Sequence, residues 1–221
     1  MNMPRIALIH ATPVAIDPIR EAFASTWPQA QTTNVLDDAL STDLAAEGRI
    51  SDRMVERFVT LARYCAGCGA HAILFTCSAF GSAIEAARAA VDIPVLKPNE
   101  AMFDEALEAG RCLGLLSTFE PSIPSMVREL EEEAARRSAC ISIRTRSIPE
   151  AMVALQRGEA QVHDHLICQA SAEFSDCDVL MLAQFSMARA AVGLPQRSGQ
   201  RLLTSPHSAV ARLKREFARH A

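Results

Sequence analysis

The sequence predicts an α/β protein built from parallel strands covered by helices. Short apolar runs alternate with stretches of helical periodicity along the 221 residues, and no low-complexity or linker-like segment interrupts them. The order of these elements also repeats, at an offset of about 107 residues. The predicted fold is therefore two pseudo-symmetric lobes, each a parallel sheet flanked by helices, with the active-site cleft between them.

The strands of this fold are predicted at short apolar runs bounded by turn residues. The run Ala72-Ile73-Leu74-Phe75 is apolar throughout, which is typical of a strand covered on both faces. The predicted strands are Arg5–His10, Ala72–Thr76, Cys112–Ser117, Cys140–Thr145, Val179–Ala183 and Arg201–Thr204, with two less apolar ones at Thr32–Leu36 and Val95–Lys97.

Between the strands, apolar residues recur at three- and four-residue spacing, which predicts amphipathic helices. The clearest of them begins after Ser51, a residue type that caps helix N-termini, and ends at Gly67 and Gly69. Further helices are predicted from Asn99 to Gly110, around Leu166–Phe174 and from about Ser208 to the C-terminus.

The repeat defines the predicted domains. In the first half a strand leads to Thr76-Cys77-Ser78 and in the second to Ala183-Gln184-Phe185-Ser186, and each is followed by a helix and a short strand that ends at a proline. We expect residues 1–98 plus 207–221 to form the first α/β lobe, which carries Cys77. Residues 99–206 are expected to form the second α/β lobe, which carries Gln184 and Ser186, and the terminal helix is expected to pack on the first.

Composition excludes several classes of partner. The net charge is −4 and aromatic residues make up 5%, so no nucleic-acid partner is predicted. No apolar stretch approaches the ~20 residues of a membrane span, and the N-terminal apolar run is too short for a signal peptide. Seven cysteines, an odd number, agree with a reducing compartment. We therefore expect a cytoplasmic protein, free to form a homo-oligomer, that binds a small molecule and has no membrane partner.

Thr76-Cys77-Ser78 is the most informative segment, because it follows a buried strand at the point where α/β folds bind their ligands. A thiol at this place is a candidate nucleophile or base, and the N-terminus of a following helix would lower its pKa. The alternative interpretation is a buried cysteine that packs as a small apolar residue. The setting favours a functional role for Cys77 over the other cysteines.

Two other patterns are typical of metal or redox sites, and neither is complete. Cys65-Ala66-Gly67-Cys68 falls at the end of an amphipathic helix, and the chain has no second such pair. The residues of His163-Asp164-His165 are too close in sequence to share a helix face, so this triplet indicates a solvated helix surface. No metal site is predicted.

Four segments, taken in their order and spacing, carry a resemblance to a known family. They are His10-Ala11-Thr12-Pro13, Thr76-Cys77-Ser78, Gly114-Leu115-Leu116-Ser117-Thr118 and Leu182-Ala183-Gln184-Phe185-Ser186-Met187. Over nearly the whole chain the sequence resembles the aspartate/glutamate racemase superfamily, which includes hydantoin racemases, maleate isomerase and arylmalonate decarboxylase. The resemblance implies no metal or organic cofactor, and a small carboxylate or amide as the substrate. It also implies a cleft in which cysteines exchange a proton with the carbon next to a carboxylate or carbonyl.

The second lobe departs from the family pattern. Racemases of this kind carry one cysteine per lobe, because inversion removes a proton on one face of the substrate and returns it on the other. Without a gap, the second cysteine position falls on Gln184, with Ser186 two residues on. A glutamine cannot act as a base, and a serine hydroxyl needs an adjacent base to do so. Arylmalonate decarboxylase resembles this chain in having one thiol, although on the second lobe.

The candidate site combines the strand-end residues with those that the resemblance implies. The candidate catalytic residues are Cys77, Ser186 and His207, and the candidate substrate-binding residues are His10, Thr12, Thr76, Ser78, Ser117, Thr118 and Gln184. His207 and His10 are candidates for the group opposite the thiol, or merely hydrogen-bond the backbone. The hydroxyl groups either donate to a substrate carboxylate or serve as turn and cap residues.

Three functions are compatible with these residues. The first is a cofactor-independent racemase or isomerase in which Cys77 is an acid/base or nucleophile. The second is a decarboxylase in which Cys77 is the sole proton donor. The third is a silent relative that binds a ligand without turning it over. The missing thiol in the second lobe favours the second and third over an ordinary racemase, whereas the intact Thr76-Cys77-Ser78 argues against the third.

Overall fold

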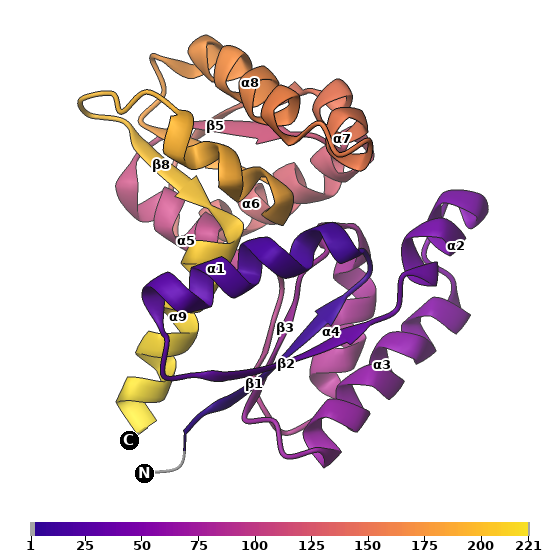
Figure 1. The fold of residues 1–221 in the computed structure, drawn as a ribbon. Coiled ribbons are helices and arrows are strands. Elements are labelled where there is room, and N and C mark those ends of the chain that lie inside the picture. Colours follow the sequence, from indigo (N-terminus) through magenta and orange to yellow (C-terminus); the bar gives the residue numbers. More distant parts are fainter. Residues whose placement is uncertain (1–2, 221) are drawn as a thin grey trace. The chain divides into compact units, whose positions relative to one another are not determined.

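The computed structural model describes residues 3–220, which form two compact units. One unit contains the chain up to Pro98 together with the segment from Ala209, and the other contains Asn99–Ser208. Each unit holds one four-stranded parallel sheet with helices packed against it (Figure 1). The predicted α/β class, with parallel sheets flanked by helices, is confirmed.

The first unit has the strand order β2-β1-β3-β4. Its strands are β1 (Arg5–His10), β2 (Gln31–Leu36), β3 (Ala72–Phe75) and β4 (Val95–Leu96). Its helices are α1 (Ile16–Thr26), α2 (Ala39–Glu47), α3 (Asp52–Gly67), α4 (Gly81–Ala89) and most of α9 (Ser205–His220), with short 3-10 turns η1 (Pro13–Ala15) and η2 (Ser78–Phe80).

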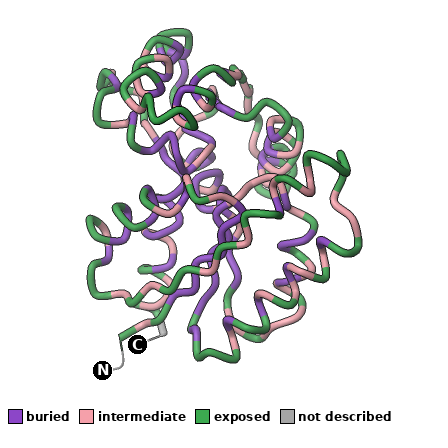
Figure 2. The backbone as a smooth tube through the Cα atoms, turned by 45° about the vertical axis from the view of Figure 1, so that its right-hand side comes forward, coloured by how far each residue is buried: buried purple, intermediate pink, exposed green. Residues whose placement is uncertain are grey.

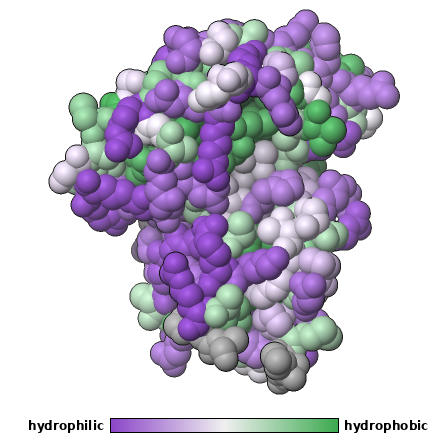
Figure 3. Space-filling view, turned by 90° about the vertical axis from the view of Figure 1, so that its left-hand side faces the viewer, coloured by the Kyte–Doolittle hydropathy of each residue, from purple (hydrophilic) through white to green (hydrophobic). Residues whose placement is uncertain are grey.

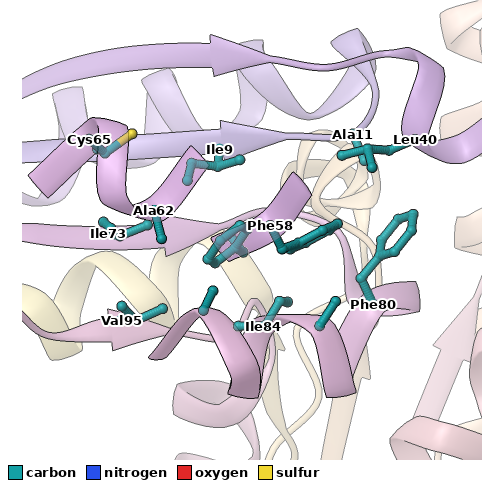
Figure 4. Packing of buried hydrophobic residues seen from close by; sticks show 14 of the residues in the cluster. Ile9, Ala11, Leu40, Phe58, Ala62, Cys65, Ile73, Phe80, Ile84 and Val95 are labelled. Carbon is teal, nitrogen blue, oxygen red and sulfur yellow. The ribbon is translucent and has the colours of Figure 1, made fainter. Parts of the chain in front are cut away.

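The core of the first unit follows from the apolar periodicity of its helices. Phe58 of α3 stacks on Phe75 of β3 with ring centroids 5.1 Å apart, and it also contacts Phe80. Figure 4 shows α3 and α4 presenting such side chains to one face of the sheet. Elsewhere in the unit α9 lies beside the end of α1, where the ring of Phe217 contacts that of Trp27, the residue that follows α1.

The second unit repeats this plan with the strand order β6-β5-β7-β8. Its strands are β5 (Cys112–Ser117), β6 (Ser142–Ser147), β7 (Val179–Leu182) and β8 (Arg201–Thr204). Its helices are α5 (Glu100–Ala109), α6 (Ile123–Arg136), α7 (Pro149–Gln156) and α8 (Ala160–Ser171), with 3-10 segments η3 (Glu120–Ser122), η4 (Ala172–Phe174) and η5 (Phe185–Gly193).

Both faces of the second sheet are buried under helices. Residues of α5 and α6 pack with Leu113 and Leu115 on one face, and residues of α7, α8 and η5 pack with Leu116 and Leu180 on the other. The central strands of both units are buried apart from the first residues of β1 and β5, and Figure 2 shows buried backbone at the centre of each unit. Strands covered on both faces are read from sequence as continuous apolar runs, and this is why β3 and β7 were predictable.

The strand register confirms the internal repeat. Ile9 pairs with Phe75 across β1 and β3, and Leu116 pairs with Leu182 across β5 and β7. Each residue of the second pair lies 107 positions after its counterpart in the first. The two sheets therefore match residue by residue where their central strands end.

A predicted strand and the predicted terminal helix differ from the structure by two or more residues at an end. The strand predicted at Cys140–Thr145 is β6, Ser142–Ser147, whose side chains are largely exposed. An edge strand of this kind has little apolar pattern to fix its limits. The terminal helix begins at Ser205 and not near Ser208, so His207 lies within its first turn.

The surface is mostly polar. On the face drawn in Figure 3, hydrophilic residues predominate and apolar ones reach the surface in smaller groups. Among the described residues, no helix is both long and apolar enough to span a membrane.

Candidate active site

The candidate residues lie at the carboxyl ends of the central strands in each unit. In the first unit β1 ends at His10, and β3 is followed by Thr76 and Cys77. In the second unit β5 ends at Ser117, and β7 is followed by Ala183 and Gln184. Parallel α/β sheets bind their ligands at this edge.

Cys77 is the N-cap residue of η2, with extended backbone angles, and it keeps some accessible surface. Burial raises the pKa of the Cys77 thiol, whereas a hydrogen bond from the backbone N–H of Ala79 acts in the opposite direction. The expectation of a lowered pKa is therefore wrong. Only the short turn Ser78–Phe80 follows the thiol directly, and desolvation of the thiolate outweighs what its amide contributes. At neutral pH the sulfur carries its proton.

His10 is fully buried and both of its ring nitrogens are occupied. Nδ1 lies 2.9 Å from the Thr76 hydroxyl oxygen, and Nε2 lies 2.9 Å from Asn34 Oδ1. Burial lowers the pKa of His10, opposed by the hydrogen bond to Asn34, so the ring is neutral near pH 7. Asn34 Oδ1 can only accept, so Nε2 carries the ring proton and Nδ1 accepts from the Thr76 hydroxyl.

This network fixes the residue before the thiol. The Thr76 hydroxyl donates within the unit, and the Thr76 N–H donates to the Ile9 carbonyl at 3.1 Å. His10 thus holds the Thr76 side chain in place, and Thr76 in turn positions the backbone that carries Cys77. Thr12 and Ser78 lie at the same edge, as the residue before η1 and the first residue of η2, and both are partly exposed.

Gln184 occupies in the second unit the position that Cys77 occupies in the first, since it lies 107 residues later, as the paired strand residues do. Its side-chain amide is fully used within the unit. Oε1 accepts from the Thr118 N–H at 2.8 Å, and Nε2 donates to Ser117 Oγ at 3.0 Å and to Ser122 Oγ at 3.1 Å. The glutamine therefore holds the turn after β5 in one conformation.

The turn that Gln184 holds is itself closed by hydrogen bonds to Phe119. The Phe119 carbonyl accepts from Ser117 Oγ at 3.1 Å and from Ser122 Oγ at 2.7 Å. Ser117, Thr118 and Ser122 are all buried. Two predicted substrate-binding residues, Ser117 and Thr118, are thus brought together with Gln184 into one polar cluster.

Ser186 and His207 also belong to the second unit, but the Ser186 hydroxyl is not hydrogen-bonded to His207. Ser186 Oγ is buried and has no hydrogen-bond partner within residues 3–220. His207 is exposed, and its Nδ1 lies 2.8 Å from Thr204 Oγ1. A buried hydroxyl without a partner is costly, and such groups gather at functional sites.

The patterns typical of metal sites do not form one. No cluster of three or more His, Cys, Asp or Glu side chains in the described part of the chain is arranged to bind a metal ion. Cys65 is buried in the core and Cys68 is exposed. The prediction of a solvated surface at His163 is wrong, because its side chain is fully buried and its Nδ1 lies 2.8 Å from Asp164 Oδ1.

Sequence reasoning missed two residues that organise the site. Asn34, the partner of His10, lies on the edge strand β2, and Ser122, a partner of Gln184, lies in η3. Neither residue directly follows a buried strand, and that position is what predicts the strand-end residues of the site. Chain geometry alone does not predict that a turn brings Ser122 back to Gln184.

A family model described as Asp/Glu/Hydantoin racemase matches residues 11–213. A comparison with curated protein sequences found no match. Among solved structures, an aspartate racemase homologue from Pyrococcus horikoshii is 13% identical with a TM-score of 0.76, covering 98% of this chain and 100% of its own. Allantoin racemase from Klebsiella pneumoniae is 14% identical with a TM-score of 0.74, and the shares covered are 98% and 89%.

Unliganded arylmalonate decarboxylase is similar as well, at 17% identity and a TM-score of 0.60, covering 97% of this chain and 92% of its own. At such identities the likeness shows a shared fold.

Proposed function

Because the chain belongs to the Asp/Glu/hydantoin racemase family, we propose that it catalyses cofactor-independent proton transfer at the carbon next to a carboxylate or carbonyl of a small substrate. In this proposal Cys77 is the group that exchanges the proton. The single observation that carries it is the position of Cys77 at the carboxyl end of β3, next to a threonine held by a buried histidine. The chain then acts as an isomerase or racemase.

The raised pKa of Cys77 indicates that the thiol of the free protein is a proton donor and not a proton acceptor. A sulfur that keeps its proton at neutral pH is suited to donate it to a carbanion or enediolate. To remove a proton, the thiolate would have to form when substrate is bound, with the Ala79 N–H stabilising it. Carboxylate recognition is proposed for the exposed rim, Thr12 and Ser78, since Thr76 already donates to His10.

The opposite face of the substrate needs a second group if the product is inverted. Gln184 is unsuited to this role, because an amide cannot take up a proton and both its ends are hydrogen-bonded. Ser186 has a free hydroxyl, and His207 is the titratable residue proposed to serve it. Ser186 and His207 are therefore the proposed candidates for this second group, in place of a second thiol.

Decarboxylation is the second candidate function, and one observation favours it. Cys77 is the only thiol at the two equivalent strand-end positions, and it is protonated, which suits a lyase that returns a single proton after loss of carbon dioxide. A silent relative would keep the same fold without turnover.

The test is incubation in deuterated water with a panel of amino acids, hydantoins and substituted malonates. Deuterium at the α-carbon together with loss of optical activity indicates racemisation. Carbon dioxide release with one deuteron retained indicates decarboxylation. Binding of panel members without exchange, inversion or carbon dioxide release would overturn the proposed proton transfer and favour the silent relative.

A further inference from the structure

The second unit contains a pair of thiols outside the candidate site. Cys112 is the first residue of β5 and Cys177 lies two residues before β7, and their Sγ atoms are 3.4 Å apart. The backbones are bonded at this point, since the Asp178 N–H donates to the Cys112 carbonyl at 2.9 Å. The pair therefore lies at the amino ends of strands whose carboxyl ends carry Ser117 and Gln184.

Packing keeps both sulfurs on one face of the sheet. Cys112 and Cys177 belong to the same apolar cluster as Phe174, whose ring occupies the space that a side chain at position 114 would need. A disulfide has an S–S distance of about 2.05 Å, so the sulfurs must approach by about 1.4 Å. Of the two side chains, that of Cys112 is partly exposed and that of Cys177 is buried.

We propose that Cys112 and Cys177 form a site of oxidative modification, at which a disulfide oxidant of the glutathione type links them in an intramolecular disulfide. Cys112 is partly exposed, whereas Cys177 is buried, so Cys112 reacts first. Its thiolate attacks the oxidant, breaks the oxidant's S–S bond and releases one glutathione thiolate.

The second step resolves the mixed disulfide. Cys177 loses its proton and attacks Cys112 Sγ, which breaks the bond to glutathione and releases the second glutathione. Two protein thiols are oxidised, one oxidised glutathione is reduced to two glutathione molecules, and the two thiol protons pass to the released thiolates.

A cation lies beside the resolving thiol. Arg144 Nη1 is 3.9 Å from Cys177 Sγ, and its guanidinium is 5.7 Å from the centre of the Phe174 ring. Arg144 also pairs with Asp176 at 2.5 Å, which fixes its position. A cation here stabilises the thiolate that the second step requires. Burial raises the pKa of Cys177 to about 12, so the resolving step is expected to limit the rate.

The test is a peptide map of the native protein after incubation with oxidised glutathione, acid quenching and alkylation. We expect a linked peptide pair containing Cys112 and Cys177, with a mass about 2 Da below the sum of the reduced peptides because two hydrogens are lost. Cys68 and Cys140 are exposed and serve as internal controls that acquire glutathione under the same conditions.

Two variants separate the steps. In Cys177→Ser the glutathione should remain on Cys112, and in Cys112→Ser the Cys177 thiol should remain free. A wild-type map in which Cys68 and Cys140 have reacted while Cys112 and Cys177 remain thiols would overturn the proposal. So would a stable glutathione adduct on Cys112 in the wild type. The wild-type map decides the question by itself if a variant fails to fold.

Discussion

Replacing Gln184 with leucine should destabilise the second unit, because leucine keeps the volume of the side chain and removes its amide. The three hydrogen bonds of 2.8, 3.0 and 3.1 Å to Thr118, Ser117 and Ser122 would be lost. Their partners are buried at 2%, 0% and 1% exposure, so water cannot replace the glutamine. At about 1 kcal/mol each, the free energy of unfolding should fall by about 3 kcal/mol.

The assay is urea unfolding monitored by circular dichroism. The fluorescence of Trp27 shows that the first unit is folded before urea is added. Gln156→Leu is the matched control, since Gln156 is exposed on α7 and the same exchange there should stay within about 0.5 kcal/mol. If Gln184→Leu costs no more than Gln156→Leu, the anchoring role of Gln184 is refuted.

Two further predictions concern the first unit, and a third concerns the core of the second unit. The wild-type protein should lose stability between pH 7.5 and pH 5, and His10→Gln should reduce that loss by at most about 2 kcal/mol. The folded pKa of His10 lies below the unfolded value of 6.5, so the stability that neutral His10 contributes is present above pH 6.5 and is lost as the pH falls below 6.5. Identical dependence of stability on pH in the variant and the wild type would contradict this. Cys77 should react with a thiol probe more slowly than the exposed Cys140 at pH 7, measured by mass spectrometry; faster labelling would disprove a raised pKa. Gly114→Ala should lower the free energy of unfolding by about 2 kcal/mol, because the new Cβ would lie 2.5 Å from a ring carbon of Phe174. Gly67→Ala is the control and should not lower it, because a Cβ at Gly67 has no atom within 4 Å.

The sequence was sufficient for the fold because its central strands are buried on both faces. Ala72–Phe75 and Val179–Leu182 are continuous apolar runs, and their position was predicted to within one residue. The edge strand Ser142–Ser147 was placed two residues early, because side chains that face water leave no apolar pattern.

The site was predictable as a set of strand-end positions but not as a set of contacts. The alignment of Gln184 with Cys77 followed from a gapless repeat, which the strand register supports. That Gln184 is bonded to Ser122 depends on the conformation of a turn, and that the Cys77 sulfur is desolvated depends on packing around it. Neither is encoded in residue spacing. The burial of His163 could have been inferred, since Ile167 and Ala170 share its helix face.

The role of Cys77 is tested most directly by the rate of α-carbon deuterium exchange in deuterated water, measured on the best substrate of the panel. Cys77→Ala is compared with Cys140→Ala, which removes an exposed thiol of the second unit. We expect Cys77→Ala to slow exchange by at least about 100-fold and Cys140→Ala to leave it unchanged. A Cys77→Ala protein that exchanges within about twofold of the wild-type rate would contradict the proposal that this thiol transfers the proton.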